Sequence, residues 1–66
     1  MEITINGEKQ THRGPLTVGD LLQLLKIDPR AVVVERNMTI LERGTMESET
    51  IEDGDAIEII RFVGGG

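Results

Sequence analysis

Three consecutive glycines, Gly64, Gly65 and Gly66, are the residues of this 66-residue chain with the clearest chemical potential, and they follow a largely apolar run at 57–63. Glycine loses more conformational freedom on ordering than any other residue, but its missing Cβ lets the backbone pass through a narrow space. Two interpretations follow. The glycines are a frayed end, or they carry the terminal carboxylate of Gly66 into the active site of an enzyme that reacts with it.

The side chains offer little chemistry of their own. The sequence has no cysteine and one histidine, His12, which excludes disulfides, a thiol nucleophile and a thiolate metal site, and argues against zinc. His12 has no nucleophile to pair with, and Asp53 and Asp55 flank Gly54 in a pattern typical of a turn. The sequence therefore predicts a protein that is not itself an enzyme and that binds no cofactor of its own.

The charge and hydropathy of the chain narrow the choice of partners. A formal net charge of −5 and a single aromatic residue, Phe62, argue against binding to nucleic acid and to anionic membranes. No apolar stretch reaches transmembrane length and no signal peptide is visible, so we expect a cytoplasmic protein. Six of the carboxylates fall within residues 47–58. This acidic stretch is either a solvated face or a dock for a basic partner.

The N-terminal third predicts a hairpin and a helix. Apolar and polar residues alternate from Met1 to Asn6, Asn6-Gly7 suits a tight turn, and the polar segment Glu8–Arg13 reads as a returning edge strand. Thr17 and Asp20 have the spacing of a capping box. Apolar residues follow at helical spacing, and Pro29 stops the helix near Lys26. These apolar residues are Val18, Leu21, Leu22 and Leu25.

The rest of the chain predicts three strands and a loop. Ala31–Val34 is apolar on both faces and contains three β-branched valines, which favours an interior strand. Met38–Leu41 is expected to be a short strand, and Arg43–Thr50 an irregular loop from which Met46 reaches the core. Ala56–Phe62 is the last long strand. Ile57 and Ile59 share one of its faces, and Ile60 and Phe62 share the other.

This order of elements predicts an α+β fold in which one main helix covers one face of a mixed sheet of four to five strands. The first and last strands are the most apolar, so they should lie side by side and parallel in the middle of the sheet, with the helix in the crossover. That arrangement is a β-grasp, the ubiquitin-like architecture. We expect residues 1–63 to form this domain and residues 64–66 to be a flexible tail.

On these residues the whole chain resembles the ThiS family of sulfur-carrier proteins. The matching segments are the closing run 53–66, the central Val32–Asn37, the opening Ile3–Glu8 and the helix start Thr17–Leu22. A terminal di-glycine alone is weak evidence. A β-grasp pattern that ends on it is much more specific.

The resemblance implies that Gly66 carries sulfur as a thiocarboxylate. A ubiquitin-activating-like adenylyltransferase would join the Gly66 carboxylate to AMP, using ATP and magnesium. An enzyme-bound persulfide would then displace AMP, and thiazole synthase would receive the sulfur for thiamin biosynthesis. The carrier is a co-substrate in this scheme. Gly64 and Gly65 thread the partner's active site, and the predicted partner interface comprises Ile60, Phe62 and Val63.

Several other functions fit the same pattern. The small subunit of molybdopterin synthase shares the fold and the terminal di-glycine, but its members tend to be longer and richer in aromatic residues. Carriers for tRNA thiolation or cysteine synthesis are related alternatives. A protein modifier that forms isopeptide bonds with lysine, and a plain binding module with an incidental glycine tail, belong to different classes.

Overall fold

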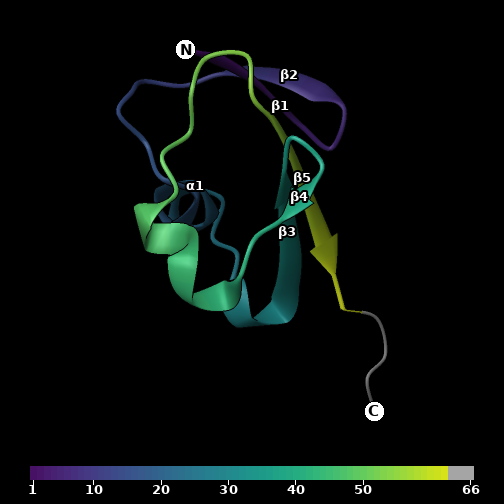
Figure 1. The fold of residues 1–66 in the computed structure, drawn as a ribbon. Coiled ribbons are helices and arrows are strands. Elements are labelled where there is room, and N and C mark those ends of the chain that lie inside the picture. Colours follow the sequence, from purple (N-terminus) through teal and green to yellow (C-terminus); the bar gives the residue numbers. More distant parts are fainter. Residues whose placement is uncertain (63–66) are drawn as a thin grey trace.

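The computed structural model describes residues 1–62, which form one five-stranded mixed sheet with a single α-helix packed on one face (Figure 1). The strand order is β2-β1-β5-β3-β4. β1 and β5 are parallel, whereas β2 and β3 run antiparallel to their inner neighbours. The predicted β-grasp is confirmed. The elements are β1 Glu2–Ile5, β2 Glu8–Thr11, α1 Val18–Leu24, β3 Val32–Arg36, β4 Thr39–Ile40 and β5 Ala56–Arg61, with 3₁₀ turns η1 Pro29–Ala31 and η2 Arg43–Ser48.

The first hairpin forms as the sequence predicts. Asn6 and Gly7 have φ angles of 49° and 84°, so both turn residues lie in the left-handed region that a two-residue hairpin with the correct twist requires. Ile3 and Ile5 are buried on the face toward α1, and β2 forms the edge of the sheet.

Helix α1 begins with the predicted capping box. The Asp20 N–H donates to Thr17 Oγ1 at 3.0 Å, and the Thr17 N–H donates back to Asp20 Oδ2 at 3.1 Å. Val18, Leu21 and Leu22 are buried against the sheet, as their spacing predicts. No helix within residues 1–62 is long and apolar enough to cross a membrane.

The predicted irregular loop at 43–50 is wrong, because residues Arg43–Ser48 form the 3₁₀ helix η2. Short-range hydrogen bonds build it: the Thr45 N–H and Oγ1 both donate to the Glu42 carbonyl, and Ser48 Oγ donates to the Thr45 carbonyl. Met46 is 4% exposed and packs into the core as predicted. A single apolar residue in the segment gives no helical periodicity from which η2 could be inferred.

A buried carboxylate ties the middle of the chain to the start of β5. Asp55 is 6% exposed. It accepts hydrogen bonds from Arg36 Nε at 2.7 Å, Asn37 Nδ2 at 2.9 Å and the Glu52 N–H at 2.8 Å. The Arg36 guanidinium also lies 3.5 Å from carboxylate oxygens of Glu49 and Glu52. Asp53 Oδ1 accepts from the Glu2 N–H at 2.7 Å, so four of the six carboxylates of the acidic stretch are bound within the domain. Asp55 is therefore more than a turn residue.

These contacts set the titration of Asp55. Burial raises its pKa, but the hydrogen bonds from the Glu52 N–H and the Asn37 amide and the Arg36 guanidinium together lower the pKa below the ordinary value of 3.8. A carboxyl with a lowered pKa in the folded state adds stability above the unfolded-state pKa. That contribution is lost as the pH falls through 3.8 toward the folded-state value.

We expect Asp55→Asn to lower the free energy of unfolding at neutral pH by about 2–3 kcal/mol, because it leaves Arg36 without its closest charged partner. The same variant should lose part of the acid sensitivity of the wild type below about pH 4. Urea titrations at several pH values measure both effects.

Asp28→Asn is the matched control, because it removes the exposed Asp28–Arg30 ion pair. It should change stability far less than Asp55→Asn does, because an ion pair between exposed groups is screened by solvent and contributes little. Equal effects of the two substitutions would show that the Asp55 cluster contributes no more than a surface ion pair.

Candidate functional site

The candidate site is the end of β5, the strand that leads into the predicted tail. β5 lies in the middle of the sheet, between β1 and β3 (Figure 1). Its pairing with β3 runs from Arg36 opposite Ile57 to Val32 opposite Arg61. Beyond the strand, the Phe62 N–H donates to the Ala31 carbonyl at 3.1 Å. The last described residue is therefore still hydrogen-bonded to the domain.

The Asn6 side chain extends the shorter pairing on the other side of β5. β1 pairs with β5 only as far as Ile5 opposite Ile57. Asn6 Oδ1 then accepts from the Ile59 N–H at 2.8 Å, and Asn6 Nδ2 donates to the Ile59 carbonyl at 3.2 Å. The amide thus takes the place of a backbone partner where β1 has already turned away.

Asn37 holds the beginning of β5 in a similar way. Its Oδ1 accepts from the Ala56 N–H at 2.9 Å, and its own N–H donates to the Ala56 carbonyl at 2.8 Å. Like Asn6, it has a left-handed backbone, with φ 51°. An asparagine in a tight turn thus binds the backbone in each half of β5, at Ala56 and at Ile59. The sequence predicts Asn6 as a turn former only and does not predict the contacts of Asn37, because the partners of both side chains lie far away in the sequence.

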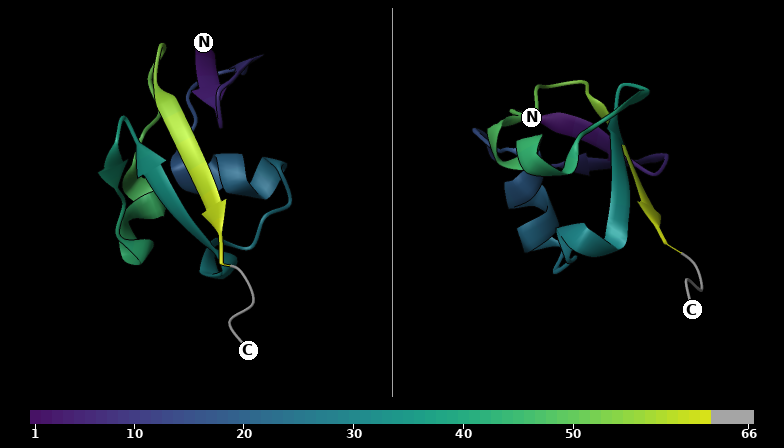
Figure 2. Two further views of the ribbon diagram at one scale, coloured as in Figure 1. Left: turned by 90° about the vertical axis from the view of Figure 1, so that its right-hand side faces the viewer. Right: turned by 60° about the horizontal axis from the view of Figure 1, so that its bottom comes forward.

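The helix-free face of the sheet carries the predicted exposed residues. Ile60 and Phe62 are 49% and 57% exposed, whereas Ile57 and Ile59 are buried under α1. Val33 lies directly opposite Ile60 on β3 and is half-buried. This face looks toward the viewer in the left panel of Figure 2, with β5 in front of α1. The structure thus places Ile60 and Phe62 on the opposite face from Ile57 and Ile59, as their alternation predicts, and leaves an exposed apolar patch there. Their assigned role as partner contacts stays a prediction.

The rest of the predicted site lies outside the described residues. Val63, predicted as an interface residue, and Gly64, Gly65 and Gly66 all follow the last described position. Their assigned roles stay predictions.

Sequence reasoning missed the contribution of the β3–β4 hairpin to this face. Ile40 and Met38 are 66% and 91% exposed. Ile40 lies opposite Glu35, which in turn lies opposite Glu58. The register between β3 and β5 connects these residues to the patch, and a sequence pattern alone does not supply that register. One local signal indicates this surface: Met38, a large apolar residue, occupies the second turn position of the β3–β4 hairpin, where the β1–β2 hairpin has Gly7.

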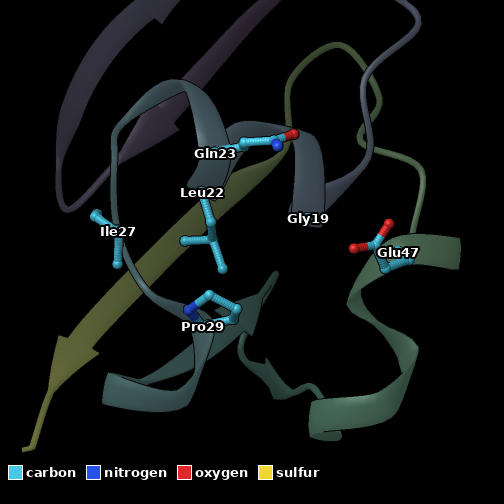
Figure 3. Close-up of a pocket in the computed structure, with 6 residues that line it drawn as sticks. All are labelled: Gly19, Leu22, Gln23, Ile27, Pro29 and Glu47. Atoms are coloured by element: carbon cyan, nitrogen blue, oxygen red, sulfur yellow. The ribbon is translucent and has the colours of Figure 1, made fainter.

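Two shallow hollows among residues 1–62 lie on the α1 side of the domain. One, of about 200 Å³, lies between α1 and η2 and is lined by Gly19, Leu22, Gln23, Ile27, Pro29 and Glu47 (Figure 3). A Cβ at Gly19 would lie 3.3 Å from Glu47 Cδ, so glycine lets η2 approach the helix closely. The other hollow is lined by Leu16, Asp20, Gln23 and Leu24, and Asp20 is engaged in the helix cap.

Neither hollow brings a nucleophile together with a base. Their polar groups are single carboxylates and an amide, whereas acid–base or nucleophilic catalysis needs two positioned groups that act on each other. His12 is half-buried and its Nε2 lies 2.9 Å from Gln10 Oε1. What the described residues provide is a firmly held strand with an exposed apolar face beside its end.

Comparison with known proteins identifies relatives over the full length of the chain. The sequence model of the ThiS family matches residues 2–66. A crystal structure of the thiamine biosynthesis protein (ThiS) from Geobacter metallireducens is 42% identical, covers all of both chains and superposes with a TM-score of 0.86. The sulfur carrier protein ThiS of Bacillus subtilis is 40% identical over 50 residues, which is 76% of each chain.

A second kind of relative is much longer. A thiazole synthase of Paramagnetospirillum magneticum is 41% identical over all 66 residues of this chain, and one of Magnetococcus marinus is 38% identical over the same length. The chain spans only 20% of the length of each of these two relatives. Both therefore contain a segment similar to this whole chain together with a much larger remainder.

We expect Asn6→Gly to loosen the second half of β5 without disturbing the hairpin turn, since glycine tolerates the φ of 49° at this position. Loss of the two side-chain bonds to Ile59 should lower the free energy of unfolding by about 1–2 kcal/mol. It should also speed hydrogen exchange of the Ile59 amide more than that of the Ile57 amide.

Asn6→Asp is the matched variant, because it keeps an acceptor for the Ile59 N–H but places a carboxylate oxygen beside the Ile59 carbonyl. Its Ile59 amide should be protected better than in Asn6→Gly. Unchanged exchange at Ile59 in both variants would show that Asn6 serves only the turn.

Proposed function

The chain belongs to the ThiS family, and we propose that it is a sulfur carrier protein that supplies the sulfur of the thiazole in thiamin biosynthesis. The observation that carries this proposal is the coincidence of two features. The family match extends through residue 66, and the central strand β5 remains hydrogen-bonded up to Phe62, the residue before Val63 and the glycines. These two features support the proposal that the domain presents its carboxyl end to an enzyme.

The proposed chemistry takes place on the Gly66 carboxylate. A carboxylate is a poor electrophile, so the partner first forms an acyl-adenylate with ATP and Mg²⁺ and releases pyrophosphate. The terminal sulfur of an enzyme-bound persulfide attacks the acyl carbon and AMP leaves. Cleavage of the remaining S–S bond by a second thiol gives the thiocarboxylate. That sulfur is the nucleophile delivered to the acceptor.

The composition of the chain supports this assignment. The sequence has no cysteine, so no side-chain thiol competes with the carboxyl end for sulfur. Glycine at positions 64 and 65 leaves room for the backbone in a narrow channel. The protein acts as a co-substrate that is consumed and regenerated, and the adenylation chemistry belongs to its partner.

Three partners follow from this scheme: a ubiquitin-activating-like adenylyltransferase, a persulfide donor and thiazole synthase. The long relatives named thiazole synthase support the last of these, because each contains a segment similar to this whole chain. The exposed Ile60 and Phe62, with Val63, are proposed to contact these partners beside the tail. The cytoplasmic location stays a prediction of the sequence.

Incubation with the adenylyltransferase, ATP, Mg²⁺ and a persulfide donor should replace one oxygen atom of the protein by sulfur. Intact-mass spectrometry measures this exchange, and addition of thiazole synthase with its other substrates should reverse it. An unchanged mass with an activating enzyme that loads another ThiS protein would contradict the carrier function. Sulfur retained with thiazole synthase but lost to a pterin precursor would identify a molybdopterin carrier instead.

Deletion of Gly66 should abolish adenylation, because the carboxylate is then one residue short of the reaction centre. The free energy of unfolding should stay within about 0.5 kcal/mol of the wild type, as for surface changes away from packed contacts. ATP–pyrophosphate exchange and urea unfolding of the same preparation measure the two effects. A variant that is adenylated at the wild-type rate would place the reaction elsewhere.

A further inference from the structure

Two carboxylates on the helix-free face of the sheet lie directly opposite each other. Glu35 on β3 and Glu58 on β5 are register partners. Like charges in this arrangement destabilise a sheet, because their side chains lie within about 5.5 Å of each other at the Cβ atoms. The ion pairs formed within residues 1–62 join Arg30 to Asp28 and Arg36 to three other carboxylates. Neither Glu35 nor Glu58 has a cationic partner there.

The turn beside this pair contains a second locally unfavourable choice. Asn37 and Met38 have φ angles of 51° and 70°, the same left-handed pair that Asn6 and Gly7 form in the first hairpin. Glycine occupies that position without strain, but a bulky residue does not. The Met38 side chain is 91% exposed, so no packing within the described domain compensates for the strain.

These two features belong to one surface. Glu35 on β3 lies between Ile40 on β4 and Glu58 on β5. Val33, two residues before Glu35 on the same face of β3, lies opposite Ile60. We call the group Glu35, Met38, Ile40 and Glu58 the hairpin strip. Its members Glu35 and Glu58 adjoin Val33 and Ile60, the near end of the apolar patch, on the face seen in the left panel of Figure 2. The strip thus has two carboxylates flanked by exposed apolar side chains. A partner protein matches it if the partner's surface carries a guanidinium or ammonium group between apolar side chains.

We propose that the hairpin strip is a docking surface for thiazole synthase, and that a basic side chain of the synthase lies between Glu35 and Glu58 while apolar side chains contact Met38 and Ile40. This inference rests on the proposed function. Charge complementarity supports it, because a cation there removes the repulsion between the two carboxylates. The synthase is the chosen partner because the long relatives of that name carry a segment similar to this chain.

Contacts made by the strip would also offset the free-energy cost of ordering the tail. Ordering a glycine tail inside an enzyme opposes binding. The folded body must therefore supply contacts away from the tail, and the β3–β4 hairpin lies at the end of β5 remote from Phe62, beside Ile57. Contacts at both ends of β5 would fix the direction in which the strand points at the synthase.

The test is the binding of the whole protein to purified thiazole synthase, measured by calorimetry at low and high salt. Glu35→Gln with Glu58→Gln should raise Kd about tenfold or more and flatten its salt dependence. The unfolding midpoint of the free variant should stay equal or rise, because a like-charge pair is removed. Glu8→Gln with Glu42→Gln makes the same change in net charge at exposed positions outside the strip, and should leave Kd within about twofold.

Met38→Gly provides an independent variant. It should raise the unfolding midpoint, because glycine suits the left-handed turn, and yet weaken binding to the synthase about fivefold through lost apolar contact. Greater stability combined with weaker binding is a result that a purely structural role of the residue would not produce.

Distinct outcomes separate this inference from the function on which it rests. If the wild type gains sulfur but both sets of variants bind the synthase as it does, the docking inference is wrong and the carrier function stands. Weakening confined to the adenylyltransferase overturns the assignment to the synthase. If the wild type gains no sulfur and binds no synthase, the proposed function fails and the inference fails with it.

Discussion

The structure depends on the way in which β5 is held. This strand bonds to β3 along its whole length and to β1 over its first half, and the side chain of Asn6 continues that second ladder to Ile59. Asn37 and the buried Asp55 fix the beginning of the strand. A small domain has a thin core and few contacts to spare. Concentrating hydrogen bonds on one strand gives a firm base for whatever follows it in the chain.

The two faces of the sheet have different roles: one packs against the core, and the other is the proposed surface for partner binding. Ile57 and Ile59 pack under α1 with the rest of the core, whereas Ile60 on the same strand and Phe62 just beyond it are exposed. Because side chains alternate along a strand, one segment of chain serves both purposes. The locally unfavourable residues, among them Met38, lie on or beside the solvent face. Natural sequences tend to break local rules where function demands it.

The sequence predicted the architecture well because its signals were local. Asn6-Gly7, the Thr17–Asp20 capping box and the period-two pattern of the last strand each depend on residues a few positions apart, and the structure confirms all three. The 3₁₀ helix η2, the Asp55 cluster and the contacts of Asn6 with Ile59 were missed, because each depends on tertiary contacts or on backbone bonds without apolar periodicity. Only the register of β3 against β5 shows that Glu35 faces Glu58.

In the proposed function the domain is a support, and the chemistry takes place at the carboxyl end of the chain. Tandem mass spectrometry of the sulfur-loaded protein, after proteolysis at Arg61, tests that claim most directly. We expect the sulfur atom in the C-terminal peptide, in the smallest fragment that contains Gly66. Sulfur bound to any internal residue, or a loaded protein whose C-terminal peptide has an unmodified carboxylate, would contradict it.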